Sequence, residues 1–161
     1  MIIDALQAAD ATRFHDHLVD RFGIPHAVLD DFSVHQPGRQ RLFMMRRGID
    51  APMGFEIQAI GIPFAYTAGV EPRLTHGALR LLGHHATRNV IDLDHADDAS
   101  RFFTRDELDL PETLRSRCTA PGQVLVRYDG VVLGLARLDA EGRLRSQLRK
   151  EAYSLRAGIE P

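Results

Sequence analysis

The stretch that decides the fold lies toward the C-terminus, where residues 122–138 read GQVLVRYDGVVLGLARL. Asp129-Gly130 stands between two runs rich in β-branched residues, and these two residue types tolerate the positive φ that a tight hairpin turn requires. A two-residue loop pairs Tyr128 with Val131 and Val124 with Leu135. The pattern therefore predicts a β-hairpin whose buried face carries Val124, Val126, Tyr128, Val131, Leu133 and Leu135.

The opposite face of the hairpin is expected to carry small residues beside an arginine. In the same register Leu125 pairs with Gly134, Gln123 with Ala136, and Arg127 with Val132. Small residues in a strand let another group approach the sheet closely. Two interpretations stay open: a neighbouring helix or strand packs on this face, or nucleic acid lies there beside Arg127.

Charge is distributed unevenly along the 161 residues, although the formal net charge is only -2. Residues 1–91 are neutral overall, residues 92–110 carry a net charge of -5, and residues 111–161 carry +3. All basic residues except Lys150 are arginine. This bias fits either an arginine-rich genome or phosphate recognition, for which the guanidinium fork is well suited. A basic segment that follows an acidic one is typical of a nucleic-acid-binding face.

The basic segment begins after a turn predicted at Asp139–Gly142. Arg143 and Arg145 flank Leu144, so an extended backbone would point both guanidinium groups away from a buried leucine. Together with Arg149 and Lys150 they could neutralise several phosphates, and the affinity would then fall as salt rises. A solvated surface with no ligand is the alternative.

The remainder of the chain is predicted to contain short helices and strands. Helical spacing of Phe14, Leu18 and Phe22 follows a capping residue, Asp10, and Gly23 ends the pattern. The other expected elements are strands at 32–35 and 41–46 around a Pro37-Gly38 turn, a strand at 55–60, a helix capped by Thr75 that ends at Leu82-Gly83, a strand at 89–93, a helix capped by Asp94, and a short turn opened by Pro111.

These elements predict an α+β protein with two small units packed against each other, an N-terminal α/β unit at residues 1–83 and a second unit at residues 84–161. A hydrophobic content of 44% supports buried cores. The longest charge-free stretch, residues 57–70, is too short to span a membrane and contains Gly61 and Pro63. No signal peptide is expected at the start, and one cysteine allows no disulfide framework. We expect a cytoplasmic protein.

The order of segments resembles a known family. The segment GQVLVRYDGVVLGLARLDAEGRLRSQLRK is similar to the PUA-like C-terminal region of Sun/RsmF-type RNA cytosine-5 methyltransferases. The upstream segments LLGHHATRNVIDL, ASRFFTRDELDL and RFHDHLVDRFGIP resemble the parts that precede and open that region. Arg145 and Lys150 occupy the family's basic positions after the hairpin. The two-part layout is also similar to Nip-type ribosome-biogenesis proteins.

The chain departs from that family at identifiable positions. Arg149 stands where the family usually has proline, and Arg105 where glycine is common. There is no glycine-rich S-adenosylmethionine loop and no Pro-Cys pair, since the one cysteine lies in Ser116-Arg117-Cys118-Thr119. The resemblance therefore implies that residues 84–161 form a PUA-like mixed β-barrel that binds RNA, without the methyltransferase. Cys118 is not expected to be a nucleophile.

Catalytic and metal-binding motifs are not found in the sequence. Lys150 is followed by Glu151, which excludes a P-loop, and there is no Gly-x-Ser-x-Gly elbow. The histidines lack metal-ligand spacing, and only His76 with His84 or His85 could converge. We therefore expect no cofactor, no metal and no catalytic residue.

The sequence predicts a non-catalytic RNA-binding protein that contacts structured RNA, either rRNA or tRNA, in ribosome biogenesis or RNA modification. A ribosome-assembly or methyltransferase protein is a second expected partner. The alternative function is a protein–protein adaptor that docks through the Gly134/Ala136 face or through phenylalanines of the first unit, Phe14, Phe22, Phe32 and Phe43. The residues predicted to contact RNA are Arg88, Arg127, Arg137, Arg143, Arg145, Arg149 and Lys150.

Overall fold

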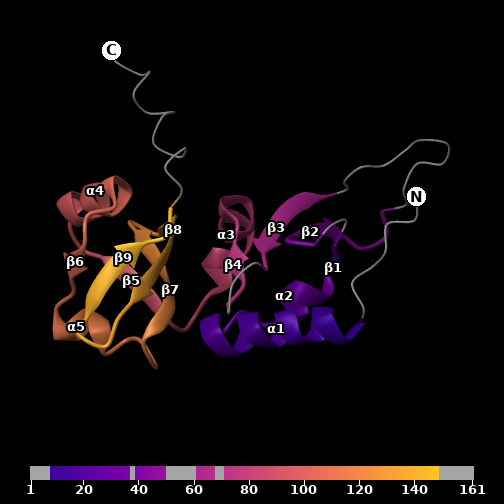
Figure 1. Ribbon diagram of the computed structural model, residues 1–161, viewed down its shortest axis with the longest axis horizontal. Coiled ribbons are helices and arrows are strands. Elements are labelled where there is room, and N and C mark those ends of the chain that lie inside the picture. The colour runs from indigo at the N-terminus through magenta and orange to yellow at the C-terminus, as the bar shows by residue number, and fades with distance from the viewer. Residues whose placement is uncertain (1–7, 37–38, 50–60, 68–70, 149–161) are drawn as a thin grey trace, which may run out of the picture. The chain divides into compact units, whose positions relative to one another are not determined.

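A computed structural model describes residues 8–36, 39–49, 61–67 and 71–148 (Figure 1). The chain divides into two compact units, residues 1–85 and 86–161, whereas the sequence analysis places the boundary after residue 83. Both units combine helices with a sheet, so the α+β class is confirmed.

The first unit contains an antiparallel sheet with strand order β1-β2-β3-β4. Its elements in chain order are α1 (Ala8–Phe22), α2 (His26–Asp30), β1 (Phe32–His35), β2 (Arg41–Arg46), β3 (Ile62–Tyr66), β4 (Arg73–Leu74), α3 (His76–Leu82) and the 3-10 turn η1 (Gly83–His85). The first two strands lie where the sequence predicts them. The helix is also present, but it begins at Ala8, so Asp10 lies inside it and is not its cap. The expected turn at 37–38 and the expected strand at 55–60 lie outside the described residues.

One face of this sheet forms the core of the first unit. Val34, Leu42 and Leu74 are buried on it, and the ring of Phe64 lies 5.3 Å from that of Phe14 on α1. A bulge between Leu42 and Phe43 sets Phe64 outside the regular pairing. Burial of these apolar side chains fixes which way each strand faces, because neighbouring residues on a strand point to opposite sides.

The helix cap at Thr75 is confirmed. Its hydroxyl accepts a hydrogen bond from the Ala78 amide at 3.2 Å and donates one to the Pro63 carbonyl at 2.5 Å. The cap therefore also fixes the start of α3 against β3. Gly83 follows the helix as predicted and continues into η1.

The second unit is a curled, half-barrel mixed sheet with strand order β5-β7-β8-β9-β6. Its elements are β5 (Val90–Leu93), α4 (Ala96–Thr104), β6 (Leu108–Asp109), α5 (Glu112–Arg115), β7 (Gly122–Tyr128), β8 (Val131–Leu138) and β9 (Arg143–Ser146). β5 runs parallel to β7, and the other pairs are antiparallel. The segment 92–110 thus supplies strands to both edges of the sheet.

The hairpin is present, but its predicted register is only partly right. Tyr128 pairs with Val131 across the Asp129-Gly130 turn, where both residues have positive φ. A bulge then shifts the pairing by one residue, so Val126 pairs with Gly134 and Val124 with Ala136. A bulge places two residues of one strand opposite one of its partner. The two small residues therefore lie on the same face as Val124 and Val126.

That face is the core of the second unit, and the space over Gly134 is filled. A Cβ at Gly134 would lie 2.8 Å from Leu148 and 3.6 Å from Phe102 on α4. Ala136 belongs to the same buried cluster. Of the two interpretations of the small residues, packing of neighbouring elements is correct, and nucleic acid against this face is wrong because side chains occupy it.

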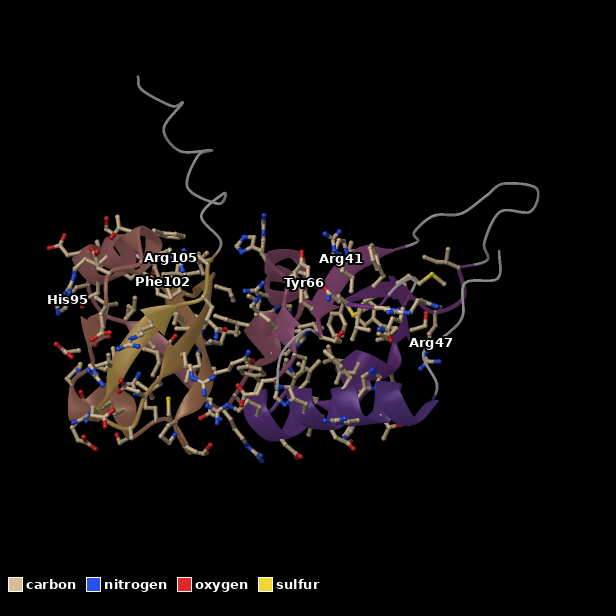
Figure 2. All side chains as sticks on the ribbon, viewed as in Figure 1. Arg41, Arg47, Tyr66, His95, Phe102 and Arg105 are labelled. Atoms are coloured by element: carbon tan, nitrogen blue, oxygen red, sulfur yellow. The ribbon has the colours of Figure 1, made fainter. Side chains whose placement is uncertain are left out.

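The helix α4 is present, but Asp94 does not cap it. The cap position is His95, whose side chain makes no capping hydrogen bond. Arg105 ends the helix in the left-handed conformation, with φ 65° and ψ 24° (Figure 2). Glycine adopts this conformation more easily than other residues. The glycine common at this position in the resembled family would therefore fit the backbone better.

Candidate nucleic-acid interface

Arg127 is the most enclosed of the predicted RNA contacts that lie within the described residues. Strand pairing of β5 with β7 places it beside Asp92, and its Nε and Nη2 donate hydrogen bonds to the two carboxylate oxygens at 2.8 and 3.0 Å. The side chain is only 23% exposed. Such a two-point contact holds the guanidinium in a fixed plane and satisfies the donors that a phosphate would use.

Arg143 and Arg145 project from β9, as predicted, on either side of the buried Leu144. The Arg143 backbone amide and Nε each donate to Asp139 at 2.8 Å, and its Nη2 lies 3.4 Å from Glu141. Arg145 donates from Nε to Glu107, which follows α4. The two predicted phosphate contacts are therefore each in an ion pair.

The pKa values of the Arg143 pair follow from this geometry. Desolvation raises the pKa of Asp139, but hydrogen bonds from the Arg143 amide and guanidinium outweigh it and leave the pKa below its usual value. The hydrogen bond to Asp139 raises the pKa of Arg143 further. Both groups stay ionised near neutral pH, so the pair persists.

The other predicted contacts differ in placement. Arg137 is exposed and pairs across the sheet with Arg145 and Gln123. Arg88 is exposed and precedes β5. Arg149 and Lys150 lie outside the described residues.

The hairpin surface is close to electrically balanced. Three of its arginines, 127, 143 and 145, are paired with four carboxylates, those of Asp92, Glu107, Asp139 and Glu141. Two of these acids come from segment 92–110. Folding therefore brings the acidic and basic segments of the sequence together.

A different concentration of arginine and aromatic side chains lies on the first unit. Strand alternation and register assign one set of residues to the face of its sheet opposite the buried Val34, Leu42 and Leu74. We call this set the outer face. Its members are Ser33, His35, Arg41, Phe43, Met45, Pro63, Tyr66 and Arg73. None of these described residues is acidic.

Two arginines on the outer face contact the same ring. Tyr66 pairs with Arg41 on one side and with Arg73 on the other. The guanidinium carbons lie 5.7 and 5.4 Å from the ring centroid, within the range of cation–π attraction. Figure 2 shows Arg41 and Tyr66 on neighbouring strands. Among the described residues neither guanidinium makes an ion pair, so in this part of the chain no carboxylate cancels their charge.

A second row crosses the outer face next to the first. His35 pairs with Phe43, and Phe43 with Pro63. His35 accepts or donates a hydrogen bond at Nε2 with the Ser33 hydroxyl, 2.9 Å away, and burial lowers its pKa. A neutral imidazole, a phenyl ring and a proline thus form a largely apolar strip beside the charged row.

The sequence analysis missed this face because it rests on β3 and β4, which were not predicted. Pro63 lies inside β3 and argues against a strand when the sequence is examined alone. The available signal was in β2, where Arg41, Phe43 and Met45 alternate with the apolar Leu42 and Met44.

The surfaces expected for a protein adaptor are mostly enclosed. Gly134 and Ala136 lie in the core of the second unit, and Phe14 and Phe22 in that of the first. Phe32 and Phe43 are half-buried. The adaptor surface proposed from the sequence is therefore wrong at four of its six residues.

The histidines do not gather into a metal site in the part of the chain that the structure describes. The rings of His84 and His85 are tilted against each other, with centroids 3.8 Å apart. Burial is the main cause that lowers the pKa of His85, and the charge of His84 lowers it further. Within the described ranges, no helix is long and apolar enough to cross a bilayer.

No family model matches the chain, and no curated protein matches it either.

Proposed function

We propose that the protein is a non-catalytic RNA-binding protein, with structured rRNA or tRNA as its ligand and the cytoplasm as its location. The observation that carries the proposal is the pair of arginines over Tyr66 on a face with no acidic member among the described residues. RNA recognition combines guanidinium contacts to phosphate with stacking on aromatic rings. The outer face offers both chemistries within one sheet.

The second unit is proposed to be PUA-like. The curled mixed sheet, the parallel β5–β7 pair and the hairpin with its Asp129-Gly130 turn support this proposal. Arg88, Arg137 and the partly exposed Arg143 and Arg145 are proposed as supporting contacts, because exposed ion pairs contribute only about 0–1 kcal/mol and can exchange for phosphate. Ribosome biogenesis or RNA modification is the process we propose.

The test is fluorescence anisotropy of labelled rRNA and tRNA fragments with the full chain. The double variant Arg41→Gln/Arg73→Gln should bind about tenfold more weakly, and its log–log salt slope should fall by about 1.4, the value for two lost single-strand phosphate contacts. The matched double variant Arg143→Gln/Arg145→Gln removes the same charge from paired sites and should cost less than about threefold.

Two results would reject the proposal. The first is absence of binding by the unaltered protein at low salt. The second is equal binding by the unaltered protein and the Arg41→Gln/Arg73→Gln variant, since the carrying observation would then have no consequence.

A further inference from the structure

The outer face carries one aromatic ring on each of the two central strands of its sheet. Phe43 lies on β2 and Tyr66 on β3, and the sheet order places both strands between β1 and β4. Both side chains are half-buried, so part of each side chain is exposed. Their backbone positions are offset along β2 by the two residues from Arg41 to Phe43, about 7 Å.

We infer that this face binds single-stranded RNA by stacking one unpaired base at the Tyr66 row and the next at Phe43. The inference rests on the proposed function and names its ligand class. Four-stranded sheets that recognise RNA stack two or three bases on aromatic side chains of the sheet surface. A base in a duplex has both faces covered by its neighbours and cannot stack in this way.

Charge complementarity selects the occupant of the face. Arg41 and Arg73 flank Tyr66, so a nucleotide whose base lies at this row has its phosphate near a cation. The guanidinium planes themselves are also stacking surfaces for bases. The strip of His35, Phe43 and Pro63 is uncharged while burial keeps the pKa of His35 low, and it suits a base better than a phosphate. An apolar protein segment would leave both guanidinium groups without a counter-charge.

The experiment compares a single-stranded RNA of about ten nucleotides, a length within the usual site size, with the same sequence annealed to its complement. We expect the single strand to bind about tenfold more tightly. Phe43→Leu keeps an apolar side chain but removes the ring, and it should lose about tenfold for the single strand and leave duplex affinity unchanged. Phe43→Tyr keeps a ring at this position and should bind the single strand like the unaltered protein.

A spectroscopic signal checks stacking directly. RNA that carries 2-aminopurine should lose fluorescence on binding, and the loss should be smaller with Phe43→Leu. Thermal unfolding of Phe43→Leu verifies that this variant is folded. If it is not folded, the same fluorescence measurement with Phe43→Tyr tests whether an aromatic ring at this position stacks on the base.

Failure of the inference differs from failure of the proposed function. Equal affinity for single strand and duplex, with no effect of Phe43→Leu, would overturn the inference while RNA binding stands. No affinity for either RNA would overturn both. A dimer that Phe43→Leu dissociates would place a second copy of the chain on this face and would also overturn the inference.

Discussion

The arginines of the first unit's outer face contact an aromatic ring, whereas Arg127, Arg143 and Arg145 of the second unit bind carboxylates. Arg41 and Arg73 lie over Tyr66, and Arg127 is held by Asp92 at two points. A ring has no net charge, so a guanidinium beside it keeps its full positive field. A carboxylate cancels that field and occupies the N–H donors.

The number of arginines in a segment therefore does not determine the charge that a ligand meets at the surface. The segment 111–161 has the stronger basic signal in the sequence, with a net charge of +3. Three of its arginines, 127, 143 and 145, are nevertheless paired with carboxylates of Asp92, Glu107, Asp139 and Glu141. Residues 1–91 are neutral overall in the sequence, yet the outer face within them has two cations and no acid among its described members. Ligand attraction depends on this local arrangement.

The largest expected effect is on stability, at the Asp92–Arg127 pair. Asp92→Ala leaves a guanidinium that is 23% exposed without its partner and should lower the free energy of unfolding by about 2 kcal/mol. Arg41→Gln removes only a cation–π contact and should cost less than about 1 kcal/mol. Urea unfolding followed by circular dichroism measures both, and equal losses would contradict the contrast between paired and stacked arginines.

Arg105 differs from both groups of arginines because its backbone adopts the unfavourable left-handed conformation. Its φ of 65° favours glycine, so Arg105→Gly should raise the free energy of unfolding by about 1 kcal/mol. Arg105→Lys keeps the side-chain charge and the strained backbone and should change little. If thermal unfolding shows that Arg105→Gly is destabilising, the side chain contributes more than the backbone costs.

An arginine of the second unit that loses its carboxylate partner should attract RNA more strongly, as we expect of the arginines on the outer face. Glu107→Gln removes the carboxylate that binds Arg145 and lies 3.9 Å from Arg143, and it should raise RNA affinity about threefold with a steeper salt dependence. Asp94→Asn changes the net charge equally at an exposed site and serves as the control in the same anisotropy assay. Identical gains in both variants would mean that only net charge matters.

The smallest expected effect is a difference between the units in how their stability changes as the pH falls. Burial lowers the pKa of His15, His17, His35 and His85, all in the first unit. In the unfolded chain these histidines have higher pKa values, so they bind protons at higher pH than they do in the folded protein. The first unit should therefore lose stability as pH falls below about 6.5.

In the second unit the acidic group with a lowered pKa is Asp139, a carboxylate, which titrates at lower pH than a histidine. The pKa of Asp139 is below its usual value in the folded protein, so its stabilising contribution is present above about 4 and is lost as pH falls further. Urea unfolding at pH 7.5 and 5.5, followed by NMR signals from each unit, should show weakening of the first unit alone. His17→Gln should reduce that weakening, and simultaneous weakening of both units would contradict the assignment.

Elements with strong local signals were predictable from the sequence. The turn at Asp129-Gly130, the cap at Thr75 and the strand Arg41–Arg46 are found where expected, because each depends on a few adjacent residues. The bulge in the hairpin was not predictable, since strict alternation of Val124 to Leu135 fits a regular ladder equally well. It moved Gly134 and Ala136 into the core.

The candidate site depended on contacts between distant segments and could not be predicted in the same way. The ring of Tyr66 meets Arg41 and Arg73 only after three strands pair. Asp92 reaches Arg127 through a parallel pairing across 35 residues. Charge totals of sequence segments carry no information about such neighbours, which explains why the basic C-terminal segment was given more weight than the structure supports.

The most direct test of the central claim is NMR titration of the full chain with single-stranded RNA, with amide shifts mapped by residue. The account predicts the largest shifts in β2, β3 and β4, centred on Arg41, Phe43, Tyr66 and Arg73, and smaller shifts at Arg137 and Arg145. Shifts confined to β7–β9 would contradict it, because the paired arginines would then be the ones that bind RNA.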